Sequence, residues 1–265
     1  MSFDQLLESA QNTQDVSVNT SWGQGRTLFG GISAALAFNQ TRQLVDPQRP
    51  LRSLSVNFSG QALADTPFSL SHDVLSNGKS ISQVTAKVVQ NDRTVTHVAA
   101  CFGLERESGI HVNAEKVDLP KLGTHPRMQY MKGLTPEFVQ HFEFEYCKGG
   151  FPFTNSPLNE LAGWVRFKKP VTDFSEAHLI ALIDAWPPTV LQKLKGFAPC
   201  ATVSWNLEVI QPIALLEQPI AGDDWLYYEA EIKQAHHGYA HTEAKIYSAN
   251  GTLLVLSRQL VAIYD

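Results

Sequence analysis

The stretch from Asp173 to Pro188 constrains the fold more than any other part of the sequence. It opens with Asp173 and Glu176 at the spacing of a capping box, and it closes with two prolines, which cannot continue a helix. Between these signals, residues 177–186 are apolar on nearly every face. Because a helix that is apolar all round is buried, the sequence predicts a core helix over residues 174–186.

Asp184 interrupts this apolar helix one turn from its predicted C-terminal end. Burial disfavours the charged carboxylate, and the negative end of the helix dipole repels it. A raised pKa of this kind suits a general base near neutral pH. A structural role is the alternative, in which the carboxylate accepts hydrogen bonds from backbone amides or a neighbouring side chain.

The charge and composition exclude several classes of function. The net charge is −5 with a pI near 6.0, and the absence of a basic stripe argues against nucleic acid as a partner. No stretch approaches the roughly 20 apolar residues of a membrane span, and the polar start of the chain is not typical of a signal peptide. The three widely spaced cysteines fit free thiols in a reducing compartment. We therefore expect a cytoplasmic protein without a membrane partner.

A second predicted helix begins at Phe29-Gly30-Gly31 and continues to about Leu44. The glycine pair permits a close backbone approach, and a helix N-terminus favours a negative ligand group. Gly30 and Gly31 are therefore candidate substrate-binding residues. Tight packing of this helix against a sheet explains the glycines equally well.

Strand patterns follow each helix, so the chain reads as a duplication. Alternating, β-rich segments are predicted at 51–58, 68–75, 80–89 and 94–102, and again at 141–146, 161–167, 201–210, 225–234, 240–248 and 252–263. Residues 1–20 read as an amphipathic lead-in and a first strand ending near Trp22. We predict an N-terminal half over 1–103, a linker over 104–138 and a C-terminal half over 139–265. In each half, an antiparallel sheet curves around one helix.

Several short segments together resemble the double-hotdog acyl-CoA thioesterases of the type II class. They are Gly-Arg-Thr-Leu-Phe-Gly-Gly at 25–31, Leu-Ile-Asp at 182–184, Ala-Thr at 201–202, Asp-Trp-Leu at 224–226 and Ser-Arg-Gln at 257–259. The resemblance covers residues 20–103 and 140–264. It implies an α+β double hotdog, with two antiparallel curved sheets each wrapped around a long central helix. It also implies hydrolysis of an acyl-CoA thioester, and a homodimer or larger homo-oligomer.

The resemblance assigns three catalytic residues, which in this family hold the attacking water. Asp184 matches the helix Asp, Thr202 the strand Thr and Gln259 the last-strand Gln. Independently, period-two alternation places Gln259 on an apolar strand face, where a buried amide needs hydrogen-bond partners. Thr202 is also explained as an ordinary strand residue. Alternation would put it on one face with Ser204 and Asn206, which makes Ser204 a reserve candidate.

Aligning the two halves gives the first half no counterpart to this set. Asn39 falls where Asp184 lies, Ser53 falls opposite Thr202, and Ala100 falls opposite Gln259. The alignment predicts one working site and one pseudo-site.

Coenzyme A enters this scheme as part of the substrate, so we expect no separate cofactor and no metal. Arg26 and Lys79, with Arg52 as a further candidate, lie near turns or strand starts and are candidates for contacting the phosphates. The alternative for each is a solvated surface charge. His236, His237 and His241 are read as surface histidines, not as a metal site.

Two rival functions remain to be weighed. A hotdog dehydratase carries a His five residues after its Asp, but Thr189 stands at that position here. A non-catalytic acyl-CoA-binding or assembly protein with a vestigial site is the alternative from outside the enzymes. No Gly-x-Ser-x-Gly segment occurs, which disfavours a serine hydrolase.

Overall fold

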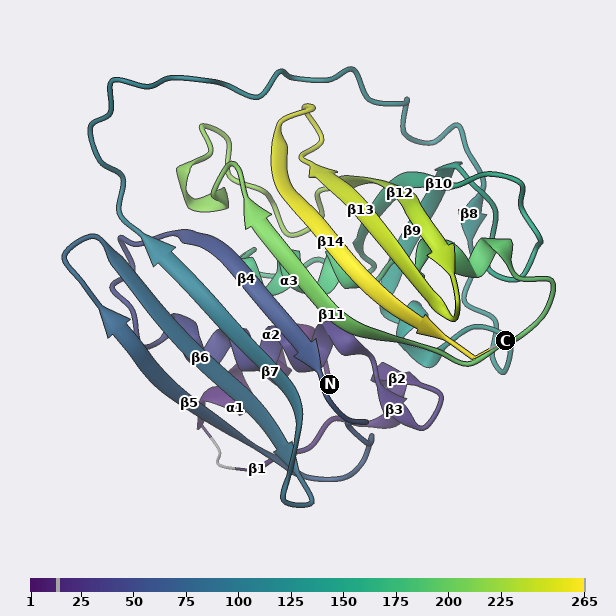
Figure 1. The fold of residues 1–265 in the computed structure, drawn as a ribbon, viewed down its shortest axis with the longest axis horizontal. Helices are drawn as coiled ribbons and strands as arrows, with labels where there is room; N and C mark the ends of the chain where they lie inside the picture. Colours follow the sequence, from purple (N-terminus) through teal and green to yellow (C-terminus); the bar gives the residue numbers. More distant parts are fainter. Residues whose placement is uncertain (13–14, 265) are drawn as a thin grey trace.

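The two halves of the chain meet edge to edge, where β4 (Leu51–Phe58) pairs antiparallel with β11 (Cys200–Val209) (Figure 1). The computed structural model describes residues 1–12 and 15–264, so positions 13, 14 and 265 of the predicted halves lie outside the described residues. The join produces a 12-stranded sheet in the order β1-β5-β6-β7-β4-β11-β14-β13-β12-β10-β9-β8. The predicted pair of half-sheets is therefore one continuous antiparallel sheet.

The remaining strands follow the predicted duplication. In the first half they are β1 (Asp15–Val16), β5 (Phe68–Asn77), β6 (Ile81–Gln90) and β7 (Arg93–Gly103), with a small separate hairpin of β2 (Gly23–Gln24) and β3 (Thr27–Leu28). In the second half they are β9 (Phe142–Lys148), β10 (Glu160–Phe167), β12 (Leu226–His236), β13 (Tyr239–Tyr247) and β14 (Leu253–Ile263). The predicted linker adds one short strand, β8 (Arg127–Met128), which pairs with β9.

The central helices α2 (Gly30–Arg42) and α3 (Glu176–Asp184) pack against each other behind the sheet in Figure 1. Small residues line α2, including Ala34, Ala35 and Ala37, none of which has exposed surface. Such residues let the two helices and the sheet approach closely. One hydrophobic core runs through both halves, as the all-round apolar character of the helices predicts.

The amphipathic lead-in is a helix, α1 (Phe3–Asn12), in which Phe3, Leu6, Leu7 and Ala10 share one buried face at helical spacing. Two local predictions are wrong. The first strand does not run to Trp22, because β1 covers only Asp15–Val16 and Thr20–Trp22 forms a 3-10 helix. Helix α3 is capped by Ser175 and not by Asp173.

The cap of α3 is a capping box closed by a histidine. His178 Nδ1 lies 3.1 Å from the Ser175 backbone nitrogen, which donates to it, and 2.8 Å from Ser175 Oγ. His178 Nε2 lies 2.9 Å from Asp4 Oδ1, which ties α1 to α3. This serine, histidine and aspartate therefore close a helix end and join two helices.

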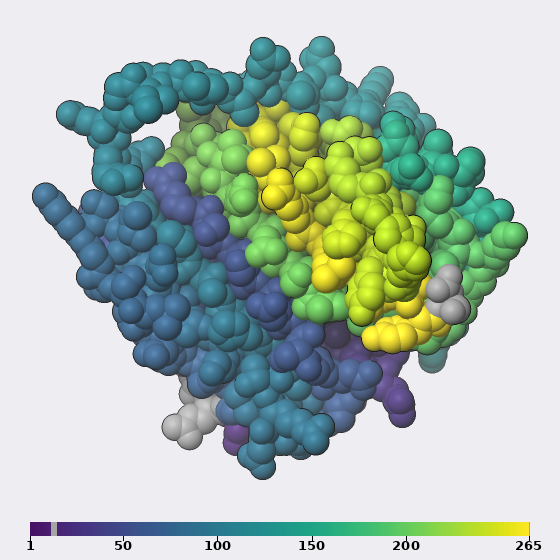
Figure 2. Space-filling view, in the orientation of Figure 1, coloured from purple at the N-terminus to yellow at the C-terminus, as the bar shows by residue number. Residues whose placement is uncertain are grey.

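The linker passes around the edge of the molecule, from the end of β7 to β8 (Figure 1). Figure 2 shows the strands of both halves as one continuous outer surface with the linker arching over its border. On this outer face Ser55 Oγ donates to Asn206 Oδ1 across the join at 2.8 Å. Among the described residues, no helix has the length and apolar content needed to cross a membrane.

Register shifts recur at matching places in the two halves. Bulges interrupt β4 between Leu51 and Ser53, and β11 between Thr202 and Ser204. Further matched shifts occur in β5 and β12, and in β7 and β14, where Val95 and Leu254 are the extra residues. Superposing the bulges aligns Ala100 with Gln259, as predicted. It aligns Leu51 with Thr202, so the predicted match of Ser53 to Thr202 is corrected.

Candidate active site

Asp184 is the last residue of α3, and it lies against the first turn of α2. A Cβ atom added at Gly30 would come within 2.9 Å of Asp184 Oδ2, and one added at Gly31 within 3.1 Å of Asp184 Cβ. The glycines are therefore needed for packing, because a side chain at either position would displace the carboxylate. The backbone N–H of Gly31 donates a hydrogen bond to Asp184. The positive end of the α2 dipole thus offsets the unfavourable end of α3.

The electrostatic environment of Asp184 matches that of a general base. Burial raises the pKa of Asp184 from 3.8 to about 7, and the hydrogen bond from Gly31 opposes this rise. The side chain retains partly accessible surface, although protein surrounds it closely enough to disfavour its charge. A carboxyl group with this pKa is ionised in a large fraction of molecules at neutral pH and can accept a proton.

Thr202 and Gln259 meet on the inner face of the sheet. Gln259 Nε2 donates to Thr202 Oγ1 at 3.0 Å. The bulge at Val203 makes this contact possible, because it turns Thr202 onto the face that carries Trp205. Simple alternation predicted Thr202 and Ser204 on one face. That prediction is wrong, since Ser204 pairs with Leu260 and with the exposed Asn57 on the outer face.

Phe58 connects the surroundings of Asp184 to those of Thr202. Its ring lies 3.2 Å from a Cβ built at Gly30, beside the Asp184 carboxylate. Phe58 is the last residue of β4, which pairs with the opening part of β11 where Thr202 lies. Asp184 and the Thr202–Gln259 pair therefore lie toward the same end of the sheet. Within the described chain no direct hydrogen bond joins Asp184 to Thr202 or Gln259, and their convergence on one water stays a prediction.

Sequence reasoning missed Tyr228 on β12, which lies near enough to Asp184 for the carboxylate charge to act on it. Burial, and to a lesser extent the negative charge of Asp184, raises the pKa of Tyr228. The Tyr228 ring stacks on Trp186, with ring centroids 5.4 Å apart and an interplanar angle of 11°. The nearby Thr189 Oγ1 is buried without a well-aligned hydrogen-bond partner among the described residues. The available signal was a polar residue on the inner, apolar register of its strand.

The predicted phosphate contacts occupy different places. Arg26 is exposed on the β2–β3 hairpin, which comes just before α2 in the chain. Lys79 lies on the β5–β6 turn, where Arg49 binds the carbonyl oxygen of Lys79. Arg49 precedes the start of β4, whereas Asp184 lies beside Phe58 at the end of β4. Arg26 therefore precedes the helix start that contacts Asp184, whereas Lys79 lies at the opposite end of β4 from Asp184.

Models of both halves of one enzyme family match the chain. Residues 18–103 match the acyl-CoA thioesterase N-terminal domain, and residues 117–263 match the acyl-CoA thioesterase C-terminal domain. The chain belongs to the acyl-CoA thioesterase family. Its activity is hydrolysis of an acyl-CoA thioester, which favours the enzyme over the non-catalytic binding protein and the dehydratase considered above.

A curated relative agrees with this family in sequence, and two solved structures resemble the chain in fold. Acyl-CoA thioesterase 2 of Haemophilus influenzae is 22% identical over 256 residues, which cover 88% of this chain and 86% of that protein. A hot-dog-fold protein of unknown function from Alicyclobacillus acidocaldarius superposes with a TM-score of 0.80 at 26% identity, over 95% of this chain and 92% of the other. An acyl-CoA thioesterase II from Mycobacterium marinum superposes with a TM-score of 0.72 at 17% identity, over 95% of this chain and 93% of the other.

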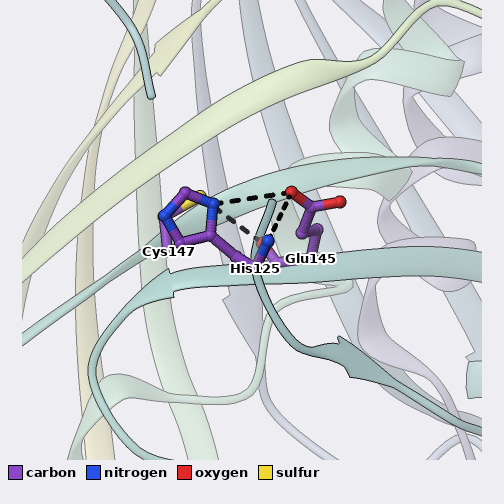
Figure 3. A group of neighbouring side chains, drawn as sticks. All are labelled: His125, Glu145 and Cys147. Atoms are coloured by element: carbon purple, nitrogen blue, oxygen red, sulfur yellow. Dashed lines mark hydrogen bonds and ion pairs between the residues drawn. The ribbon is translucent and has the colours of Figure 1, made fainter. Parts of the chain in front are cut away.

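One group of possible metal ligands occurs in the described part of this thioesterase. His125, Glu145 and Cys147 place their ligand atoms within 4.8 Å of one another (Figure 3). However, Glu145 Oε1 already accepts backbone hydrogen bonds from Gly123, Thr124 and His125. Burial, and to a lesser extent the charge of Glu145, raises the pKa of the Cys147 thiol to about 11. This disfavours metal binding, because a thiol binds metal only after losing its proton. This donor set fits a metal poorly.

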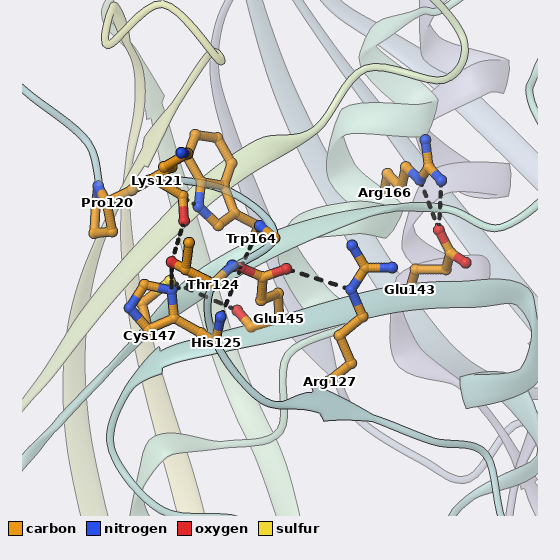
Figure 4. Close-up of polar contacts among 11 residues, drawn as sticks. Pro120, Lys121, Thr124, His125, Arg127, Glu143, Glu145, Cys147, Trp164 and Arg166 are labelled. Atoms are coloured by element: carbon orange, nitrogen blue, oxygen red, sulfur yellow. Dashed lines mark hydrogen bonds and ion pairs between the residues drawn. The ribbon is translucent and has the colours of Figure 1, made fainter.

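The same residues explain how the linker is anchored (Figure 4). Arg127 Nε lies 3.3 Å from Glu145 Oε2, so both carboxylate oxygens have partners. Burial would raise the pKa of Glu145, but the hydrogen bonds from Gly123, Arg127, His125 and Thr124 hold it below its usual value. Nearby, Trp164 Nε1 donates to the Pro120 carbonyl oxygen at 3.2 Å. Glu145 thus fastens the linker to β9.

Proposed function

We propose that Asp184 is the general base of this thioesterase and that Thr202 and Gln259 hold the attacking water. The observation that carries the proposal is the placement of Asp184 at the end of α3, against the first turn of α2, where it is partly accessible and has a pKa of about 7. The contact of Gln259 with Thr202 at the same end of the sheet supports it. Because a base reaches its proton directly or through one water, the three side chains should converge on a single water.

The proposed reaction proceeds by direct hydrolysis. Asp184 removes a proton from the water as its oxygen attacks the thioester carbonyl carbon. The tetrahedral intermediate then breaks its carbon–sulfur bond, and the departing thiolate takes the proton from Asp184. The products are a free carboxylic acid and the thiol of coenzyme A. Coenzyme A takes part only as a portion of the substrate, and no other cofactor is proposed.

The start of α2 supplies the proposed charge stabilisation. The Gly31 N–H is bound to Asp184, so it orients the base. Gly30 is the first residue of α2 and its N–H has no acceptor within the helix. In this scheme the Gly30 N–H polarises the carbonyl oxygen, with the α2 dipole behind it. Arg26, exposed just before α2, is the proposed contact for the phosphates of coenzyme A.

Two broader properties are also proposed. A homodimer or larger homo-oligomer and a role in lipid metabolism follow from the resemblance to the type II class. The three free cysteines are consistent with a reducing compartment, and we place the protein in the cytoplasm.

Release of free thiol from a panel of acyl-CoAs tests the activity and identifies the preferred acyl group. We expect turnover of at least one chain length, with thiol and acid formed in equal amounts. Saturable binding without thiol release from any member would contradict a working site.

A further inference from the structure

We infer that Thr242 on β13 is a positioning residue that fixes the orientation of the Gln259 carboxamide. The inference rests on the proposed catalytic role of Gln259. It names a residue that the family resemblance did not assign.

Thr242 is the direct cross-strand neighbour of Gln259. The two residues are opposite each other in the β13–β14 register, and Trp205 is opposite Gln259 on the other side, in β11. Both Thr242 and Trp205 are buried on the inner face. Side chains paired in this way have Cβ atoms roughly 5 Å apart, so a glutamine and a threonine can contact each other.

The hydroxyl of Thr242 lacks a partner of its own. Thr242 is 4% exposed, and its Oγ1 makes no hydrogen bond with any described residue. A buried, unpaired hydroxyl is unfavourable, because it has lost water without gaining a replacement. The closest acceptor that the register offers on the inner face is the carboxamide of Gln259.

Among the described residues, the Gln259 carboxamide forms a side-chain hydrogen bond through only one of its two ends. Its Nε2 donates to Thr202, which leaves Oε1 as the acceptor on the other end of the group. A carboxamide flip exchanges Nε2 and Oε1 at almost no steric cost. Donation from Thr242 to Oε1 would oppose the flip and keep Nε2 directed at Thr202. Thr242 thus acts through Gln259, without touching the substrate.

The first half of the chain shows what the same positions hold when there is no site. The matched bulges align Val84 and Ala100 with Thr242 and Gln259, and Val84 is opposite Ala100 in β6 and β7. The position of Thr202 in the second half corresponds to Leu51 in the first half. The polar set occurs together in one half and is apolar throughout the other. Since valine fills the Thr242 position in the first half, packing alone does not require a hydroxyl there.

The test compares Thr242→Val, Thr242→Ala and Thr242→Ser with Gln259→Ala and the double variant Thr242→Val/Gln259→Ala. Thr85→Val is the matched control, because Thr85 is a buried threonine on β6 whose hydroxyl bonds His97 and the Val98 carbonyl. Each full-length variant is assayed for kcat and KM by thiol release, and its folding is checked by circular dichroism and thermal melting.

We expect Thr242→Val and Thr242→Ala to lower kcat by about two- to twelvefold, the worth of one hydrogen bond, with little change in KM. Thr242→Ser should restore the rate. In the Gln259→Ala background, Thr242→Val should cause no further loss.

Three results would overturn the inference. Unchanged kcat in both Thr242→Val and Thr242→Ala would show that Thr242 has no positioning role. The proposed role of Gln259 would be unaffected by that result. Fully additive losses in the double variant would show that Thr242 does not act through Gln259. Full activity of Gln259→Ala alone would remove Gln259 from the proposed mechanism, and the role of Thr242 with it.

Discussion

Asp184, the last residue of α3, accepts a hydrogen bond from the backbone of Gly31 in the first turn of α2. The proposed base of the C-terminal half is therefore held by the helix start of the N-terminal half. The proposed site therefore draws on both halves, which are joined by the α2–α3 helix pair and by the β4–β11 pairing.

Gly31→Ala should damage the site through packing alone. The new Cβ would overlap the Phe29 ring, which stacks on Phe138 at 4.3 Å, and would press on Asp184. We expect a loss of about 1–3 kcal/mol in unfolding free energy and a fall in kcat/KM of up to about a hundredfold. The control is Gly109→Ala, which has open space around it. Equal behaviour of both variants in melting and kinetic assays would refute the close approach.

The pH dependence of hydrolysis should report the ionisation of Asp184. The base acts only when deprotonated, and the pKa of Asp184 is about 7. We therefore expect kcat/KM to fall tenfold per pH unit well below this value and to level off above it. Initial rates across a pH series measure the inflection. An inflection near the ordinary carboxyl pKa of about 4 would contradict a buried base.

The same pKa predicts how pH changes stability. Asp184 ionises near 3.8 when unfolded and near 7 when folded, so between these values the folded state holds a proton that the unfolded chain has lost. The free energy of unfolding should therefore fall as pH rises through this window. Asp184→Asn lacks this dependence. Its unfolding free energy, taken relative to that of the wild type, should therefore rise by about 2–4 kcal/mol from about pH 4 to about pH 8. Urea unfolding at both pH values checks this, and a constant difference would count against it.

The sequence predicted the architecture because its strongest signals are local. An apolar helix bounded by a cap and two prolines, and strands with period-two alternation, can be read without knowing their partners. The bulge at Val203 cannot be read in this way, because it depends on how β11 registers against β14. For that reason the sequence named Thr202 only by resemblance and put Ser204 on the wrong face.

Cross-strand neighbours were missed for a related reason. Tyr228 and Thr242 are ordinary strand residues in the sequence. Only the folded structure shows that Asp184 acts electrostatically on Tyr228 and that Thr242 is opposite Gln259. The edge-to-edge join of β4 to β11 was likewise hidden, because a strand pattern does not reveal which strand lies beside it.

Glu145→Gln should loosen the linker without removing the catalytic groups. Glu145 has no exposed side-chain surface, although only the thin linker covers it, and it holds three backbone N–H groups and Arg127. We expect a loss of roughly 1–3 kcal/mol in unfolding free energy and faster proteolysis within 104–135. Glu160→Gln is the control, because its ion pair with Lys148 is exposed and should matter little. Identical cleavage rates for both variants would argue against the anchor.

The rate of thioester hydrolysis by Asp184→Asn tests the catalytic assignment most directly. Asparagine is nearly the same size as aspartate but cannot accept the proton, so the fold should persist, as monitored by circular dichroism and melting. With the best acyl-CoA of the panel, we expect kcat to fall by about a hundredfold to ten-thousandfold, the usual cost of losing a general base. A variant that is folded and retains nearly full turnover would show that Asp184 has only a structural role at the start of α2.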